Sequence, residues 1–132
     1  MDRYCFNTLV RILSDEADLK AAFLFGSAAH GGLRPDSDID VAVWMERPLA
    51  AAEKARLIHQ IATACRRPVD LVDLRRIDPV LLAEILRSGR PIIEPPVDVL
   101  ESLMQTAVRN ETDFLPLLRR ARKVRVEAFA NG

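Results

Sequence analysis

The sequence has few of the features that mark secreted or membrane-spanning proteins. Only two of its 132 residues are cysteines, Cys5 and Cys65, and they lack the spacing of zinc ligands. We therefore expect no disulfide framework and a reducing compartment. Charged side chains interrupt the apolar residues near the N-terminus, so no run resembles a signal peptide or a membrane span. These absences indicate a cytoplasmic protein without a membrane anchor.

The sequence also lacks an excess of charge of either sign. It carries 19 acidic and 19 basic side chains, so no net field attracts nucleic acid. Aromatic residues make up only 5% of the chain. None lies within the basic cluster near the C-terminus, whereas proteins that bind single strands usually add aromatic side chains on which bases stack. We expect no direct nucleic-acid substrate, and we interpret this cluster as a solvated helix face or a contact for a partner protein. The cluster consists of Arg119, Arg120, Arg122, Lys123 and Arg125.

Apolar residues make up 49% of the chain, which is sufficient for one folded domain of this length. Helical spacing predicts an amphipathic helix over Tyr4–Leu13 and a long one from Pro48 to Arg66. Asp78 followed by Pro79 predicts the start of another helix, which Gly89 ends. Short apolar runs predict four strands. These strands are Ala21–Phe25, Ile39–Trp44, Val69–Leu74 and Pro91–Glu94.

After Pro95 and Pro96 the pattern is helical only, with a further helical segment from about Thr112. We expect an α/β (α+β) fold, a small mixed β-sheet with helices packed on it. Residues 1–96 would form the main domain, and residues 97–132 a C-terminal helical extension of that same domain.

The loop between the first two predicted strands combines residues that suit phosphate binding. Gly26 follows a buried strand and lets a phosphate approach the backbone, while Ser27 offers a hydroxyl and an amide. An ordinary strand-to-helix turn also often contains glycine and serine. His30 lies in the same loop, where a lone histidine is more often simply exposed.

Asp38 and Asp40 stand two residues apart at the start of the next strand. The two-residue period of a strand directs both carboxylates to one face. Paired carboxylates repel each other unless a cation lies between them, and hard oxygen ligands favour Mg²⁺ that also binds triphosphate oxygens. The alternative is a loop of solvated acids that leads into a strand.

A third carboxylate is expected on a neighbouring strand, where Asp70 and Asp73 point to opposite faces. We favour Asp70 because it lies deeper in an apolar strand, where an unpaired charge is costly. Asp73 remains the other candidate for the third ligand. An edge-strand aspartate paired with Arg66 or Arg67 is the structural alternative.

Gly26-Ser27, ten intervening residues, Asp38-Ile39-Asp40 and a later Asp70 together resemble the nucleotidyltransferase superfamily related to DNA polymerase beta. The nearest likeness is to its minimal members, the antitoxins of HEPN/MNT toxin–antitoxin modules. The resemblance covers residues 19 to about 94. One departure is Ala28, where many relatives carry an arginine.

The resemblance implies a polymerase beta-like fold, a small mixed sheet with helices on one side. It implies ATP as the donor and two Mg²⁺ ions as the cofactor. Gly26 and Ser27 would bind the nucleotide, and Asp38, Asp40 and Asp70 would be the catalytic and metal-binding residues. The implied activity is transfer of AMP to the hydroxyl of a tyrosine in a cognate HEPN-domain toxin, as in a type VII-like toxin–antitoxin module.

Two other functions fit the same residues. The first is nucleotidyl transfer to a small-molecule acceptor, although the 36 residues after Pro96 are few for an acceptor domain. The second is a non-catalytic antitoxin that inhibits its partner by binding, as part of a hetero-oligomer with the toxin. The intact set of carboxylates argues against the second function.

Overall fold

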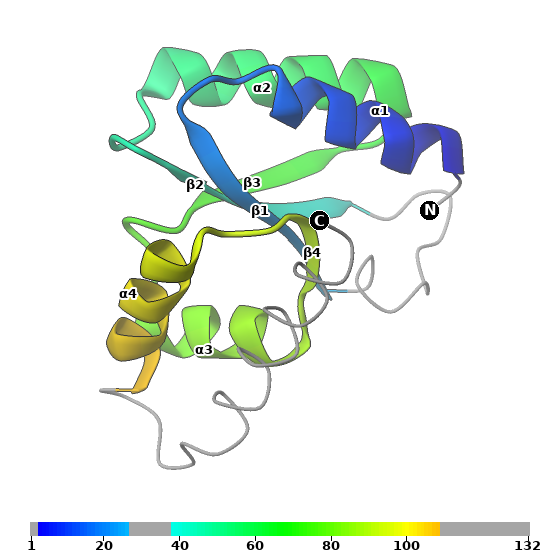
Figure 1. Cartoon of the computed structure of the whole chain (residues 1–132). Helices are drawn as coiled ribbons and strands as arrows, with labels where there is room; N and C mark the ends of the chain where they lie inside the picture. Colours follow the sequence, from blue (N-terminus) through cyan, green and yellow to red (C-terminus); the bar gives the residue numbers. More distant parts are fainter. Residues whose placement is uncertain (1–2, 27–37, 109–132) are drawn as a thin grey trace.

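The computed structural model describes residues 3–26 and 38–108, which form four helices and four strands in the order α1, β1, β2, α2, β3, α3, β4, α4 (Figure 1). Each element lies close to its predicted position. The helices are α1 (Arg3–Ser14), α2 (Ala51–Cys65), α3 (Pro79–Ser88) and α4 (Val97–Val108). The strands are β1 (Leu19–Phe25), β2 (Ile39–Met45), β3 (Val69–Asp73) and β4 (Arg90–Ile93).

The strands form one mixed sheet in the order β3-β2-β1-β4. β1 is antiparallel to β2 and to β4, whereas β2 and β3 are parallel. A parallel pair requires a crossover, and α2 supplies it. The mixed sheet that the sequence predicts is therefore confirmed.

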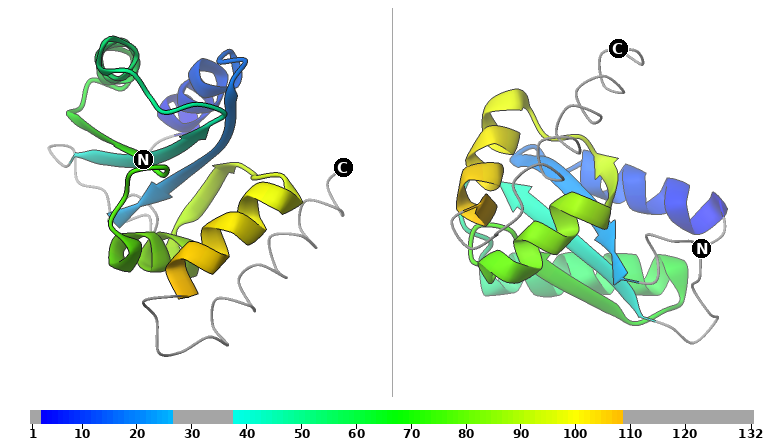
Figure 2. Two further views of the ribbon diagram at one scale, coloured as in Figure 1. Left: turned by 90° about the vertical axis from the view of Figure 1, so that its left-hand side faces the viewer. Right: turned by 90° about the horizontal axis from the view of Figure 1, so that it is seen from below.

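Helices cover both faces of this sheet, so the expectation of helices on one side is wrong (Figure 2). α1 and α2 pack on one face, and α3 and α4 on the other. The physical reason lies in the strands, whose apolar residues face both ways: Phe23 belongs to the core beneath α3 and α4, and Leu24 to the core beneath α1 and α2. A sheet that is apolar on both faces needs a helical layer on each.

The C-terminal extension begins as part of the main core. Leu100, Leu103 and Ala107 of α4 are buried against α3 and the sheet. The predicted segment from Thr112 and the basic cluster from Arg119 lie outside the described residues.

The two cysteines are bonded to each other, which contradicts the expectation of no disulfide framework. Cys5 in the first turns of α1 and Cys65 at the end of α2 form a disulfide, with their Cα atoms 5.1 Å apart. The two helices lie side by side on the same face of the sheet, which brings together residues 60 positions apart. Their spacing in the sequence gave no sign of this proximity.

Among residues 3–26 and 38–108, no helix combines the length and the apolar character that crossing a bilayer would require.

Candidate active site

Asp40 and Asp70 lie side by side where β2 and β3 begin. The parallel register pairs Asp40 with Asp70 directly, and paired residues of adjacent strands place their side chains on the same face. That face is the one covered by α3 and α4, since Ala42 and Val72, the next pair whose side chains point the same way, belong to or pack against this core. The two carboxylates therefore lie at the end of the sheet where β1 ends and where β2 and β3 begin. We call this the acidic end.

Asp38 immediately precedes β2 and is exposed at the same end. Burial raises the pKa of Asp40 above its ordinary value, and the negative charges of Asp70 and Asp38 raise it further. Both neighbouring carboxylates thus act on Asp40, and the shared role of the three aspartates stays a prediction. Their mutual repulsion is the situation that a bound cation relieves.

The burial of these residues differs from the expectation in one respect. The sequence favours Asp70 because it lies deeper in an apolar strand, but its side chain is exposed, and Asp40 is the partly buried member of the pair. β3 is an edge strand, so solvent reaches a residue there that a central strand would bury. None of the salt bridges found among the described residues involves Asp70.

Gly26 leaves β1 beside Asp40 and makes room for its carboxylate. Its φ of +64° lies in the left-handed region that favours glycine. A Cβ atom at this position would stand 2.5 Å from Oδ2 of Asp40, well inside contact distance. The sequence suggests that Gly26 admits a phosphate, and the structure adds that it leaves room for the carboxylate of Asp40.

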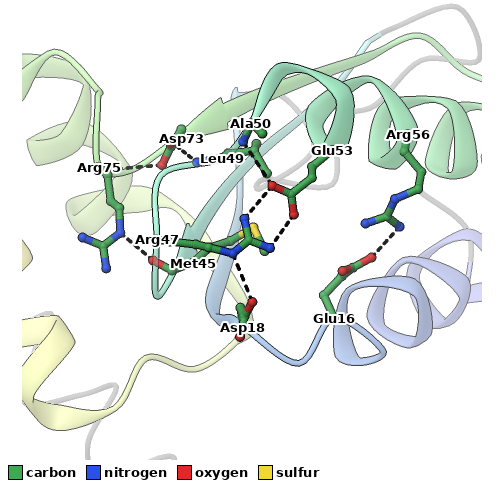
Figure 3. Close-up of polar contacts among 10 residues, drawn as sticks. All are labelled: Glu16, Asp18, Met45, Arg47, Leu49, Ala50, Glu53, Arg56, Asp73 and Arg75. Atoms are coloured by element: carbon green, nitrogen blue, oxygen red, sulfur yellow. Dashed lines mark hydrogen bonds and ion pairs between the residues drawn. The ribbon is translucent and has the colours of Figure 1, made fainter.

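Asp73 has a structural role at the opposite end of β3 (Figure 3). Its carboxylate accepts hydrogen bonds from the backbone N–H of Leu49 at 3.1 Å and of Arg75 at 2.9 Å. It thereby ties the segment before α2 to the turn after β3. The geometry favours Asp70 over Asp73 as the third carboxylate of the acidic end.

The acidic end suits a divalent cation by the chemistry of its donors. Asp38, Asp40 and Asp70 supply only carboxylate oxygens, the ligands that Mg²⁺ prefers. Within residues 3–26 and 38–108, however, no three His, Cys, Asp or Glu side chains are already gathered into a metal-binding group. The structure places the three carboxylates at one end of the sheet.

Two predicted residues of the phosphate-binding loop cannot be placed. Ser27 and His30 lie outside the described residues, so their roles stay predictions. Sequence reasoning missed Lys54 and Arg76, which line a hollow of about 270 Å³ along β3 together with Asp70. They belong to no motif, because only the tertiary structure brings them to this strand.

Comparison with known proteins connects this geometry to a family. The profile of the family "Polymerase beta, Nucleotidyltransferase" matches residues 7–97, which include the acidic end. Protein adenylyltransferase MntA of Shewanella oneidensis is 33% identical over 87 residues, which are 65% of this chain and 63% of that protein. The chain thus matches somewhat less than two thirds of the length of this relative.

Solved structures share the fold over nearly the whole chain. A toxin–antitoxin crystal structure with AMP-PNP has a TM-score of 0.66 and 26% identity, covering 95% of this chain and 93% of that one. A tri-AMPylated HEPN toxin of Shewanella oneidensis in complex with its MNT antitoxin gives a TM-score of 0.64 and 25% identity, covering 98% and 94%. The family match spans most of the chain and contains the paired aspartates on adjacent strands, so this chain belongs to the polymerase beta nucleotidyltransferase family.

Proposed function

We propose that this chain is a protein adenylyltransferase that transfers AMP from ATP to a tyrosine hydroxyl of a cognate HEPN-domain toxin and so acts as its antitoxin. The observation that carries the proposal is the meeting of Asp38, Asp40 and Asp70 beside Gly26 at one end of the sheet. The adenylyltransferase name of the MntA relative and the AMPylated toxin in a similar complex support the choice of acceptor.

The residues of the acidic end divide the task. Asp38 and Asp40 would hold Mg²⁺, two ions in the complete site, against the triphosphate of ATP, with Asp70 as a further ligand. The metal would supply charge neutralisation at the reacting phosphate and a lower pKa for the acceptor hydroxyl. Asp70 is exposed on the edge strand, where an incoming protein can reach it, and it would orient that hydroxyl and accept its proton.

Gly26 and Ser27 would seat the triphosphate. The left-handed backbone at Gly26 turns the chain at the end of β1 without a side chain in the way. The hydroxyl oxygen of the acceptor would form the new bond to the α-phosphorus, and pyrophosphate would leave. ATP as the donor also favours a cytoplasmic site of action, which remains part of the proposal.

The proposal is tested by incubating the purified chain with ATP labelled in the α-phosphate, Mg²⁺ and the cognate HEPN-domain protein. We expect label on the HEPN protein and loss of its toxic activity, and we expect Asp38→Asn to abolish both. Inhibition that persists without label, in the wild type and in Asp38→Asn alike, would show an antitoxin that acts by binding alone. Label on a small molecule instead of the protein would also overturn the proposed acceptor.

A further inference from the structure

The contact between α1 and α2 accommodates Cys5 and Cys65 in both redox states. In the bonded state their Cα atoms lie 5.1 Å apart, within the usual range for a disulfide. The Sγ atom of Cys65 also lies 3.6 Å from the carbonyl oxygen of Cys5. A reduced Cys65 thiol would therefore find a hydrogen-bond acceptor there. Opening the bond does not require the two helices to separate.

A hollow of about 480 Å³ lies beside the disulfide. Both cysteines line it, together with Tyr4, Thr63, Ala64 and Arg66. Cys5 is only 4% exposed, whereas Cys65 is half-buried. A small thiol that enters the hollow therefore reaches Cys65 more readily than Cys5. Disulfides that small thiols can reach are the ones that open and close most easily.

The charge of the hollow favours an anionic thiol. Arg66 is exposed, and no salt bridge among the residues that the structure describes involves its side chain. The residues that line the hollow include no acidic side chain. Glutathione is a small thiol whose carboxylates outnumber its amine, so Arg66 attracts it to the disulfide.

We propose that Cys5 and Cys65 form a redox-responsive pair, which small thiols of the glutathione class open and close through this hollow. A thiolate attacks the sulfur of Cys65 and forms a mixed disulfide, while Cys5 leaves as a thiolate that takes a proton from water. A second thiolate attacks the sulfur of the bound small thiol and releases Cys65. Two small thiols are thereby oxidised to one small disulfide, and the protein disulfide is reduced. The small disulfide reverses these steps and closes the bond.

The closed pair stabilises the fold because it restricts the unfolded chain. The bond joins residues 60 positions apart, and closing a loop of that length removes much of the entropy of the unfolded state. The folded fraction of the chain therefore follows the redox state of its surroundings. This response is separate from the proposed transfer of AMP, so either one can fail while the other stands.

Thiol counting on the folded chain tests the exchange. The full chain is equilibrated with reduced and oxidised glutathione in several ratios, quenched in acid, denatured and alkylated, and mass spectrometry counts the modified cysteines. We expect both cysteines to be modified at the reducing limit and neither at the oxidising limit, with the same curve from either starting state. A bond that glutathione opens only after the chain unfolds in urea would overturn the proposal. So would thiols that oxidised glutathione never joins.

Arg66→Asn tests the charge of the hollow. The φ of Arg66 is 56°, and asparagine tolerates this left-handed conformation. We expect reduced glutathione to open the bond about threefold more slowly in this variant, because the attracting cation is gone. Opening by 2-mercaptoethanol, an uncharged thiol, is the control and should keep its rate. Slowing with both thiols, or with neither, would overturn the role of Arg66.

Thermal unfolding tests the consequence for stability. We expect the oxidised wild type to unfold at least about 10 °C above the reduced wild type. Both forms have the same sequence, so no substitution contributes to this difference. Cys65→Ser, which cannot form the bond, should unfold at the same temperature with reduced and with oxidised glutathione. Equal unfolding temperatures for the two forms of the wild type would overturn the proposal.

Discussion

The two ends of the central sheet differ in whether their carboxylates are paired with hydrogen-bond donors. At the acidic end the charges of Asp38 and Asp70 raise the pKa of Asp40, and none of the three aspartates forms an ion pair with another described residue. At the opposite end every carboxylate that we describe has a donor: Arg47 bonds Glu53 at 2.5 and 2.6 Å and Asp18 at 3.2 Å, and Asp73 accepts from two backbone N–H groups (Figure 3).

This difference separates function from stability within one fold. Repulsion among carboxylates costs free energy unless a ligand offsets it, and natural proteins tolerate such conflicts mainly at functional sites. The opposite end anchors the loops that follow β2 and β3. There Arg75 donates to the carbonyls of Met45 and Glu46 at 2.6 Å and lies over the ring of Trp44.

The largest expected effect is at the acidic end. We predict that Asp40→Asn lowers the rate of AMP transfer by about 10²–10³-fold, because the substituted side chain no longer supplies the anionic ligand that the reacting phosphates require. The matched change at the other end, Asp18→Asn, weakens an exposed ion pair with Arg47 and leaves transfer within about twofold. Initial rates with saturating ATP measure both. Comparable losses in the two variants would remove the distinction between the ends.

Gly26→Ala should act through Asp40. The added Cβ would stand 2.5 Å from the Asp40 carboxylate, and a displacement of about 1 Å at a reacting centre lowers rates by about 10²-fold. Gly89→Ala is the control, because its Cβ would meet the carbonyl oxygens of Ile85 and Leu24 and destabilise the end of α3, with no atom of Asp40 among its nearest neighbours. We expect lower stability in both variants and a lower kcat only in Gly26→Ala. An unchanged kcat there would show that Asp40 does not need its present position.

Asp73→Ala should affect stability and not chemistry. Loss of the acceptor for the Leu49 and Arg75 amides is expected to lower the free energy of unfolding by about 1–2 kcal/mol. Urea denaturation measures the change, with Asp15→Ala as an exposed control that should stay within about 0.5 kcal/mol. A loss no greater than that of the control would mean that Asp73 does not tie the two loops together.

The smallest effect concerns Glu53 and depends on pH. Its hydrogen bonds with Arg47 lower the pKa of Glu53 from 4.5 to about 2. The ion pair therefore stabilises the fold fully above pH 4.5 and is lost as pH falls towards 2. We expect Glu53→Gln to be slightly less stable than the wild type at pH 7 and the difference to shrink below pH 4.5. Glu84→Gln, an exposed change on α3, should show no such trend, and a constant difference for Glu53→Gln would contradict the assignment.

The sequence predicted much of the fold because its signals were local. Asp78 does cap α3, accepting a hydrogen bond from the N–H of Val80 at 2.7 Å, and the two-residue strand period correctly separated Asp70 from Asp73. The pairing of Cys5 with Cys65 and the clearance between Gly26 and Asp40 depend on segments distant in sequence, which local patterns do not encode. The exposure of Asp70 escaped prediction for the same reason, since it depends on the place of β3 in the sheet.

The two aspartates of β3 give the most direct test of the division between the two ends. The measurement is the initial rate of AMP transfer to the HEPN-domain partner by Asp70→Asn and Asp73→Asn, each corrected for the fraction of folded protein. Asp70→Asn is predicted to lose at least about tenfold in rate, whereas Asp73→Asn is predicted to match the wild type. A full rate in Asp70→Asn together with loss in Asp73→Asn would contradict the proposed active site.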